Sequence, residues 1–502
     1  MKARNIVPIA EKTHGLCCHC SMLSRFARSV LCCTLLISVA YAKDINLAKR
    51  YRDAANKLIN ASLADEAGYN KLTYLCDRIG NRLSGSENLP KAIAWAAEQM
   101  KSDGLVNVST PPVKVPHWVR GDESGAILAP IQRPLHMLGL GMSVDTPPDG
   151  ITADAIVVSN FDELDQLGGK VSGKIVVFNA PYEDYDKTVA YRALGPSRAA
   201  KLGAVAVLVR SITPLAMQLP HTGALRYADD SPKVPAAAIS IEDATLLSRL
   251  QASGATPRIR LLMEAHAEAD ADAANVIGEI PGSEHPEEIV VIGGHIDSWD
   301  VGQGAQDDGA GIMATLEAAA LIRKLELKPR RTIRVAFWVN EENGGRGGQA
   351  YVRWAGDSVK NHVAAIEMDE GAETPVGIGY GPEPLPRRAV PGAPLPAERK
   401  PTAEEKASMK LCADIASLLK TVNADRVNPG GGGSDVEPLG VLGVPMLGPT
   451  TTGAHYFDWH HTQADTVDKV NREDFRKNVA VLAVLAYVLA DMPGRLAGSP
   501  AP

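Results

Sequence analysis

The stretch 287–311, "EEIVVIGGHIDSWDVGQGAQDDGAG", decides the fold. It begins with "EEIVVI", whose apolar run is typical of a buried strand. The nineteen residues that follow hold one histidine, four aspartates and six glycines. A helical pattern, "GAGIMATLEAAALIRKLE", starts at the end of this loop and covers residues 309–326. A strand, a glycine-rich loop and a helix in this order predict an α/β unit of a parallel sheet.

The alternation of strand and helix patterns continues to the C-terminus. Further strands are expected at 330–340, 361–369 and 443–449, and helices are expected around 347–356, at 402–422 and from Asn471 onward. We therefore predict an α/β fold with a mixed, mostly parallel sheet and helices on both faces. In such sheets, ligands bind at the carboxyl ends of the strands.

The middle of the chain, residues 121–270, has a different character. It contains four short strand patterns, "ITADAIVVS", "GKIVVFNAP", "GAVAVLVRS" and "VPAAAISI", with helical patterns between them. No cluster of histidines, cysteines or paired acids follows these strands. This section is therefore expected to be a separate α/β module with a covering or binding role.

The first 42 residues have the layout of a secretory signal. Arg25 and Arg28 precede an apolar run over residues 30–39, and Ala40-Tyr41-Ala42 forms an A-x-A cleavage site. A membrane anchor is the alternative, but the run is short for a bilayer span. We expect a signal peptide at 1–42, no stable membrane span, and a secreted or periplasmic protein.

The balance of charged residues limits the kinds of molecule that this protein is expected to bind. The whole chain has 52 basic and 59 acidic side chains, and without residues 1–42 its net charge is −11. This balance argues against nucleic acid as a partner. Cys17, Cys18, Cys20, Cys32 and Cys33 lie in the segment expected to be removed. Cys76 and Cys412 remain, as buried thiols or as one bridge.

Acids and imidazoles follow nearly every expected strand of the C-terminal half. Because the carboxyl ends of parallel strands meet at one edge of the sheet, these side chains are expected to converge. The first strand is followed by His295 and Asp297, and the set continues with Asp307, Asp308, Glu341, Glu342, Asp369, His460 and His461. A single aspartate there would more often be a helix cap; so many together predict a site.

Several carboxylates in a partly dry cleft repel one another unless cations are bound. Mixed imidazole and carboxylate ligands suit zinc better than calcium or magnesium. Two zinc ions need one bridging ligand and can activate a shared water molecule. His295 is then a ligand, with Asp297 holding its other ring nitrogen. One acid of each adjacent pair would bridge or coordinate, and one glutamate would remain free as a general base.

The motifs "GGHIDSWDVGQGAQDDGAG", "NEENGG", "EMDEG" and "HHTQADT" resemble, in this order, the aminopeptidase family with two cocatalytic zinc ions, the aminopeptidase Y group. Stretches such as "RIGNRLSGSENLPKAI" and "MLGLGMSVDTPPDGITA" extend the similarity over nearly the whole chain after residue 42. No G-x-S-x-G or H-E-x-x-H motif is present, so serine hydrolases and single-zinc peptidases are less well supported.

The resemblance implies a role for each matching position. His295 and Asp369 would be terminal ligands of different zinc ions. Asp307 would bridge the two ions, and Glu342 would be a further ligand. Glu341 would be the general base, and Asp297, through its hold on His295, is counted with it among the catalytic residues. The last ligand is expected to be His461 rather than His460, because the family's histidine stands four residues before an aspartate, as His461 does before Asp465.

The resemblance also implies a zinc exopeptidase fold with an inserted protease-associated domain. The expected segments are a signal peptide at 1–42, the N-terminal part of the peptidase domain at 43–120, the protease-associated domain at 121–270, the main part of the peptidase domain at 271–494 and a tail at 495–502. A homodimer that hydrolyses dipeptides or short peptides is implied. A broad-specificity aminopeptidase and a non-catalytic peptide-binding homologue are the alternatives.

Two features remain without a firm role. The stretch "NPGGGGSDVEPLG" lacks the lysine of a phosphate-binding loop, and we expect it to be a loop near the substrate, where Ser434 and Asp435 could touch it. Asp300, in the opening stretch, has no role that the pattern supports.

Overall fold

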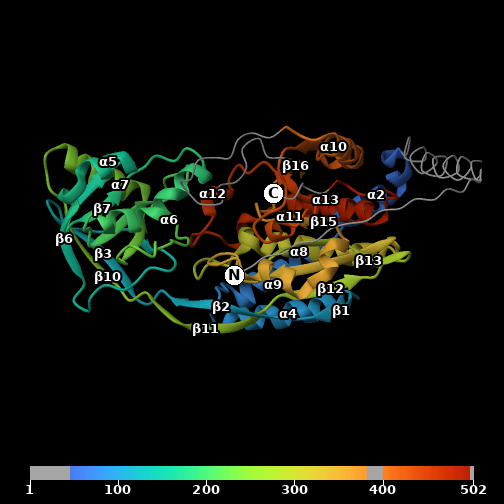
Figure 1. The fold of residues 1–502 in the computed structure, drawn as a ribbon, viewed down its shortest axis with the longest axis horizontal. Helices are drawn as coiled ribbons and strands as arrows, with labels where there is room; N and C mark the ends of the chain where they lie inside the picture. Colours follow the sequence, from blue (N-terminus) through green and yellow to red (C-terminus); the bar gives the residue numbers. More distant parts are fainter. Residues whose placement is uncertain (1–45, 382–399, 498–502) are drawn as a thin grey trace, which may run out of the picture. The chain divides into compact units, whose positions relative to one another are not determined.

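The computed structural model describes residues 46–381 and 400–497 (Figure 1). The expected signal peptide at 1–42, its cysteines and the last five residues of the expected tail lie outside this described part. Among the helices described, none combines the length and the apolar character that a membrane crossing requires.

The strand–helix half of the chain forms an eight-stranded sheet. Four neighbouring strands, β14, β13, β15 and β18, run parallel, as do β16 and β17; the remaining pairs are antiparallel. The prediction of a mixed, mostly parallel sheet is therefore confirmed. In spatial order the strands are β1 (Val106–Ser109), β12 (Val276–Ile280), β14 (Arg331–Trp338), β13 (His285–His295), β15 (His362–Glu367), β18 (Met446–Thr451), β16 (Pro375–Tyr380) and β17 (Arg426–Asn428).

Helices cover both faces of this sheet, as the burial of β13 demonstrates. Val290 and Ile292 belong to one apolar cluster, whereas Ile289 and Val291 belong to another. Successive side chains of a strand point to opposite faces, so each cluster lies on one side of the sheet. The first cluster includes residues of α2 (Leu47–Leu63), α3 (Ala67–Tyr74), α4 (Asn88–Ser102), α8 (Ala310–Lys324), α10 (Ala403–Ala416) and α13 (Arg472–Asp491). The second includes residues of α9 (Arg346–Ala355) and α11 (Glu437–Val441).

A second eight-stranded sheet occupies the middle of the chain. Its helices, α5 (Phe161–Leu167), α6 (Tyr185–Lys201) and α7 (Ile241–Ala252), gather around its strands in Figure 1. It has two apolar clusters of its own. The strand order is β4 (Arg133–Pro134), β3 (Glu123–Ala129), β10 (Arg258–Met263), β6 (Ile151–Val158), β7 (Ile175–Phe178), β8 (Ala206–Arg210), β9 (Ala236–Ile239) and β5 (Met137–Gly139). We call this sheet and its helices the inserted module.

A two-stranded ladder leads into and out of the inserted module. β2 (Pro112–Val119) pairs antiparallel with β11 (His266–Ala274). The proline-rich stretch that forms β2 gives little sign of a strand, because proline cannot donate to a ladder. Cys76 and Cys412 are buried free thiols, so the alternative of one bridge does not hold.

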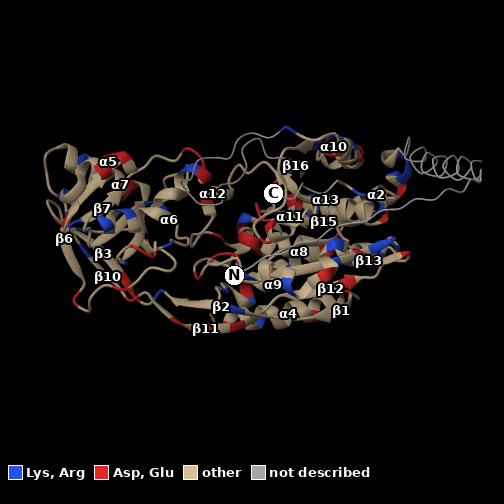
Figure 2. Cartoon of the chain, viewed as in Figure 1, with Lys and Arg blue, Asp and Glu red and all other residues tan. Residues whose placement is uncertain are grey.

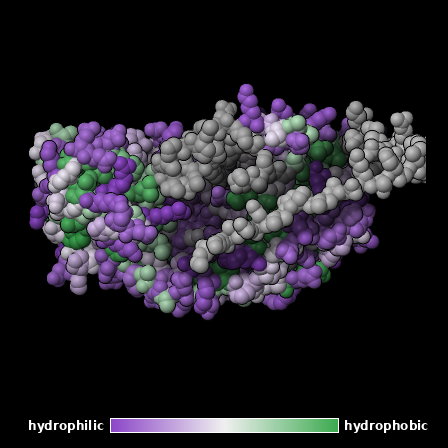
Figure 3. All heavy atoms as spheres, viewed as in Figure 1, coloured by the Kyte–Doolittle hydropathy of each residue, from purple (hydrophilic) through white to green (hydrophobic). Residues whose placement is uncertain are grey.

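The described surface is mixed in charge and mostly polar. Figure 2 shows basic and acidic residues interspersed along the helices and loops. On the face drawn in Figure 3, hydrophilic residues predominate, with smaller hydrophobic patches between them.

Candidate metal centre

His295, the last residue of β13, is the first member of the site. Its side chain is fully buried at the carboxyl end of the sheet. Its Nδ1 lies 3.1 Å from the backbone carbonyl of Asp297, and its Nε2 lies 3.2 Å from carboxylate oxygens of both Asp307 and Asp369. A carbonyl can only accept, so Nδ1 carries the proton and Nε2 is free to bind a cation.

Asp307 lies between two groups of donor atoms. Its Oδ1 faces His295 at 3.2 Å, and its Oδ2 faces His461 Nε2 at 3.2 Å. His460 is farther from Oδ2, at 3.6 Å. Within the chain itself, Oδ2 is buried without a hydrogen-bond partner. One carboxylate thus separates a His295–Asp369 pair from a second group.

That second group is completed by the turn that follows β14. Asn340 adopts a left-handed backbone conformation, with φ of 67°, and reverses the chain there. Glu342 then points to His461, with 3.0 Å between Oε2 and Nε2, while its Oε1 accepts a hydrogen bond from the Trp299 backbone. The sequence predicted one acid of this pair as a ligand, and the turn brings Glu342 to the donor cluster.

Glu341 is presented differently from its neighbour. Its backbone N–H donates to Asp297 Oδ1 at 3.1 Å, and its carboxylate accepts a hydrogen bond from Ser434. Asp297 was expected to hold the ring of His295, but its carboxylate is 3.8 Å from that ring, and the closer contact comes from its backbone carbonyl. The Asp297 side chain therefore supports Glu341 more directly than His295.

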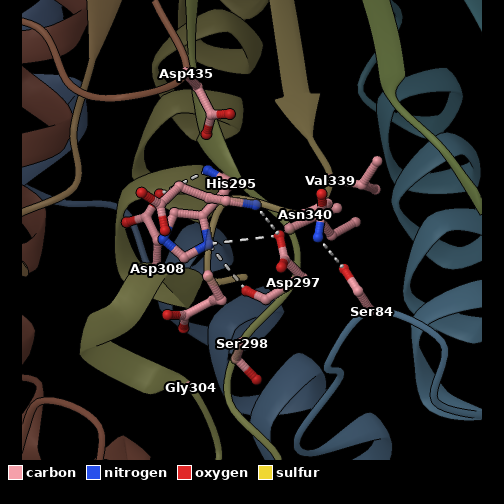
Figure 4. Close-up of polar contacts among 12 residues, drawn as sticks. Ser84, His295, Asp297, Ser298, Gly304, Asp308, Val339, Asn340 and Asp435 are labelled. Carbon is pink, nitrogen blue, oxygen red and sulfur yellow. Dashed lines mark hydrogen bonds and ion pairs between the residues drawn. The ribbon is translucent and has the colours of Figure 1, made fainter. Parts of the chain in front are cut away.

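Asp308 differs from Asp307 in the groups that its carboxylate contacts. Its carboxylate accepts hydrogen bonds from the backbone N–H groups of His295 and Gly311, both at 3.2 Å. Figure 4 shows Asp308 close against His295, with Asp297 on the other side of the ring. These bonds tie the loop to the start of α8, so Asp308 holds the backbone while Asp307 faces the donor atoms.

Burial and crowding shift the titration of this cluster. Burial, with the charge of Asp307, raises the pKa of Glu342 to about 8, and burial raises that of Asp369 to about 6. Burial opposes protonation of His461, yet Glu342 and Asp307 together raise its pKa well above the usual range. Such opposed shifts are typical of acids and imidazoles that balance one another's charge in a dry site.

Two residues that the sequence did not single out hold the loop between His295 and Asp307. Arg82 is fully buried and donates to the carbonyls of Ile296, Gln303 and Gly304. The Asp465 carboxylate accepts from the backbone of Gln306 at 2.7 Å and of Asp307 at 3.3 Å. In the sequence analysis, Asp465 was used only to prefer His461 over His460 as a ligand. Arg82 lies in the stretch "RIGNRLSGSENLPKAI", to which no role was assigned.

The glycine-rich stretch packs tightly beside the site. Gly431 has φ of 138°, and a Cβ there would come within 2.4 Å of the Gly379 carbonyl, so no larger residue fits. The buried Glu367 carboxylate accepts from the backbone of Val436 at 2.9 Å. These contacts aim Ser434 at Glu341, whereas Asp435 is buried.

A cavity of about 880 Å³ opens onto the centre. The site contributes Asp307, Glu341, Glu342, Asp369, His460 and His461 to its walls. Aromatic side chains of Tyr185, Tyr456 and Phe457 form another part, and Arg192 and Arg226 of the inserted module also line it. The volume falls in the range of small-ligand sites.

Comparison with known proteins identifies the family. The model of peptidase family M28 matches residues 275–486. Human carboxypeptidase Q is 40% identical over 443 residues, which cover 88% of this chain and 89% of that protein. The chain belongs to peptidase family M28. The predicted resemblance is thereby confirmed, and so is the prediction of a metallopeptidase.

Solved structures agree with this M28 assignment. A peptidase M28 precursor from Shewanella amazonensis SB2B is 33% identical, with a TM-score of 0.82 over 90% of this chain and 99% of that one. A zinc aminopeptidase from Bacillus subtilis shares the fold, with 18% identity and a TM-score of 0.62 over 86% of this chain and 96% of that one.

Proposed function

We propose that this M28 peptidase binds two zinc ions and hydrolyses dipeptides or short peptides. The observation that carries the proposal is the position of Asp307, with one oxygen toward His295 and the other toward His461. Asp369 would complete the first donor group and Glu342 the second. The donors fit zinc, because each group combines imidazole with carboxylate and because a divalent cation would relieve the crowding of buried acids.

Bound zinc would supply a Lewis acid that lowers the pKa of water and polarises a carbonyl. The chain's own residues supply the proton transfer. Glu341 faces the cavity, and we assign it as the base that takes a proton from water and returns it to the leaving amine. Asp297 and Ser434 fix its backbone and its carboxylate, respectively.

The cavity favours short substrates. Its volume of about 880 Å³ suits a ligand of a few residues, and the inserted module supplies part of its wall. We infer that this module is a protease-associated domain that limits access, and that the enzyme acts as a homodimer outside the cytoplasm after loss of residues 1–42. Carboxypeptidase Q, by its name, acts at a carboxyl terminus, and we extend this expectation to the present chain.

Metal analysis and a peptide panel test the proposal together. Purified protein should contain about two zinc ions per chain. Unblocked dipeptides should be cleaved, and blocking the carboxyl terminus should abolish cleavage. Cleavage that survives a blocked carboxyl terminus but not a blocked amino terminus would indicate an aminopeptidase. Absence of zinc, together with no cleavage after zinc addition, would favour a non-catalytic homologue.

A further inference from the structure

The inserted module supplies the acceptor for the second ring nitrogen of His461. Thr222 lies in the segment between β8 and β9. The His461 Nδ1 is 3.2 Å from the Thr222 carbonyl oxygen, and the Thr222 N–H donates to the His461 carbonyl at 3.0 Å. Arg192 Nη1 also lies near His461 Nδ1, at 3.5 Å, but the Thr222 carbonyl is closer. Because a carbonyl only accepts, the closer contact keeps the ring proton on Nδ1 and leaves Nε2 to face Glu342 and Asp307.

The Thr222 carbonyl is itself held by Arg192 of α6. Arg192 is 6% exposed, and its Nη1 donates to that carbonyl at 3.0 Å. Its Nη2 donates to the Tyr185 hydroxyl at 2.7 Å. The chain passes so close to the guanidinium that a Cβ on Gly223 would lie 2.2 Å from it. The Thr222 hydroxyl donates to the Gly139 carbonyl at 2.7 Å, which fixes the segment from the other side.

Tyr185, which accepts a hydrogen bond from Arg192, also begins a chain of ring contacts that ends on the face of the His461 imidazole. The Tyr185 ring stacks on Phe457, with centroids 5.0 Å apart, and meets the edge of His460 at 5.1 Å. His460 in turn stacks on His461, with a centroid distance of 3.5 Å. The imidazole of His461 is thus fixed by a hydrogen bond along its plane and by a ring across its face.

We propose that Arg192, acting through the Thr222 carbonyl, positions His461 to bind zinc, so that the inserted module is a working part of the metal site. The inference rests on the proposed function, since it assigns the residue that orients one ligand of that site. Arg192 also borders the cavity, which raises substrate binding as the competing role. Its burial and its bonds to Thr222 and Tyr185 favour positioning.

Zinc affinity measured without substrate separates the two roles. Competition with a chromophoric chelator should show Arg192→Met binding one zinc ion about 10–100-fold more weakly than the wild type. Arg192→Lys keeps one donor for the Thr222 carbonyl and should lose less. Arg198→Met is the matched control, because Arg198 lies on the same helix but pairs with Asp165 at the surface. Its zinc affinity should equal that of the wild type.

Kinetics at saturating zinc complete the test. Positioning predicts that activity of Arg192→Met recovers partly as zinc is added, with KM changed by less than about threefold. Wild-type zinc affinity with a KM raised tenfold or more would overturn positioning and assign Arg192 to the substrate. If Arg192→Met does not fold, Tyr185→Phe removes only the hydroxyl; unchanged zinc affinity in that variant overturns the proposal. Failure of the wild type to bind zinc would instead reject the proposed function.

Discussion

Replacing Glu341 by glutamine separates proton transfer from metal binding. Glutamine keeps the length of the side chain, and its amide oxygen can still accept the Ser434 hydroxyl. The backbone bond from residue 341 to Asp297 is unaffected. Within the described part of the chain, donor atoms of several His, Asp and Glu residues lie close enough together to hold an ion, and Glu341 is not one of these residues. The ability to take up a proton is lost, together with the negative charge of the carboxylate.

The loss in kcat should therefore be at least as large as the contribution of general base catalysis. That contribution is about 10²–10⁴-fold in kcat, or ~3–5 kcal/mol of transition-state stabilisation at about 1.36 kcal/mol per tenfold. Stopped dipeptide assays give kcat, and elemental analysis gives zinc content, which should remain that of the wild type. Glu98→Gln, which changes an exposed carboxylate on α4, serves as the control and should leave kcat unchanged. A kcat of Glu341→Gln within about tenfold of the wild type would refute the assignment of the base.

Three further outcomes follow from the site. Asp307→Asn should reduce bound zinc below about one ion per chain by elemental analysis, because both donor groups share this carboxylate; two retained ions would contradict the bridging role. Zinc-depleted protein should become more stable as the pH falls from about 8.5 to about 5, because burial raises the folded-state pKa of Glu342 to about 8 and that of Asp369 to about 6, so folding takes up protons. Thermal unfolding across this range should show no such rise for zinc-loaded protein, and a flat profile without zinc would count against the crowding argument. Arg82→Met should lower the free energy of unfolding in urea by ~3 kcal/mol or more, since three buried carbonyls lose a donor, whereas the exposed Arg78→Met should change it by less than about 0.5 kcal/mol.

Much of the main sheet could be predicted because its signals are local. The apolar run before His295 and the helical pattern after Gly309 fall on β13 and α8. Asn471 caps α13 through its side chain, at the point where this helix was expected to begin. The antiparallel strands β12 and β16 were missed, because they owe their pairing to neighbours distant in sequence and carry no marker residues at their ends. The β2–β11 ladder was missed because β2 contains two prolines, which cannot donate to a ladder, and because β11 consists mostly of alanine and acidic residues, which are uncommon in strands.

The candidate ligands could be named because strand ends converge in a parallel sheet. The hydrogen-bond partners that hold each ligand in place could not be named. Nothing in the sequence distinguishes Asp307 from Asp308 by chemistry; the structure separates them through the backbone donors that engage Asp308. The partner of His461 was equally hidden, because it is a backbone carbonyl, at Thr222. A carbonyl acceptor leaves no trace in residue identity, so only the folded chain reveals it.

Asp300 illustrates how far the site depends on the rest of the chain. Both of its carboxylate oxygens accept from the Arg120 guanidinium, at 2.6 and 2.7 Å. Arg120 directly follows β2, where the chain leaves the first sheet for the inserted module. The loop between His295 and Asp307 is therefore fixed both at this exit and by Arg82. Since neither arginine lies in a metal motif, the motifs name the donors, while two arginines outside the motifs hold the loop that joins His295 to Asp307.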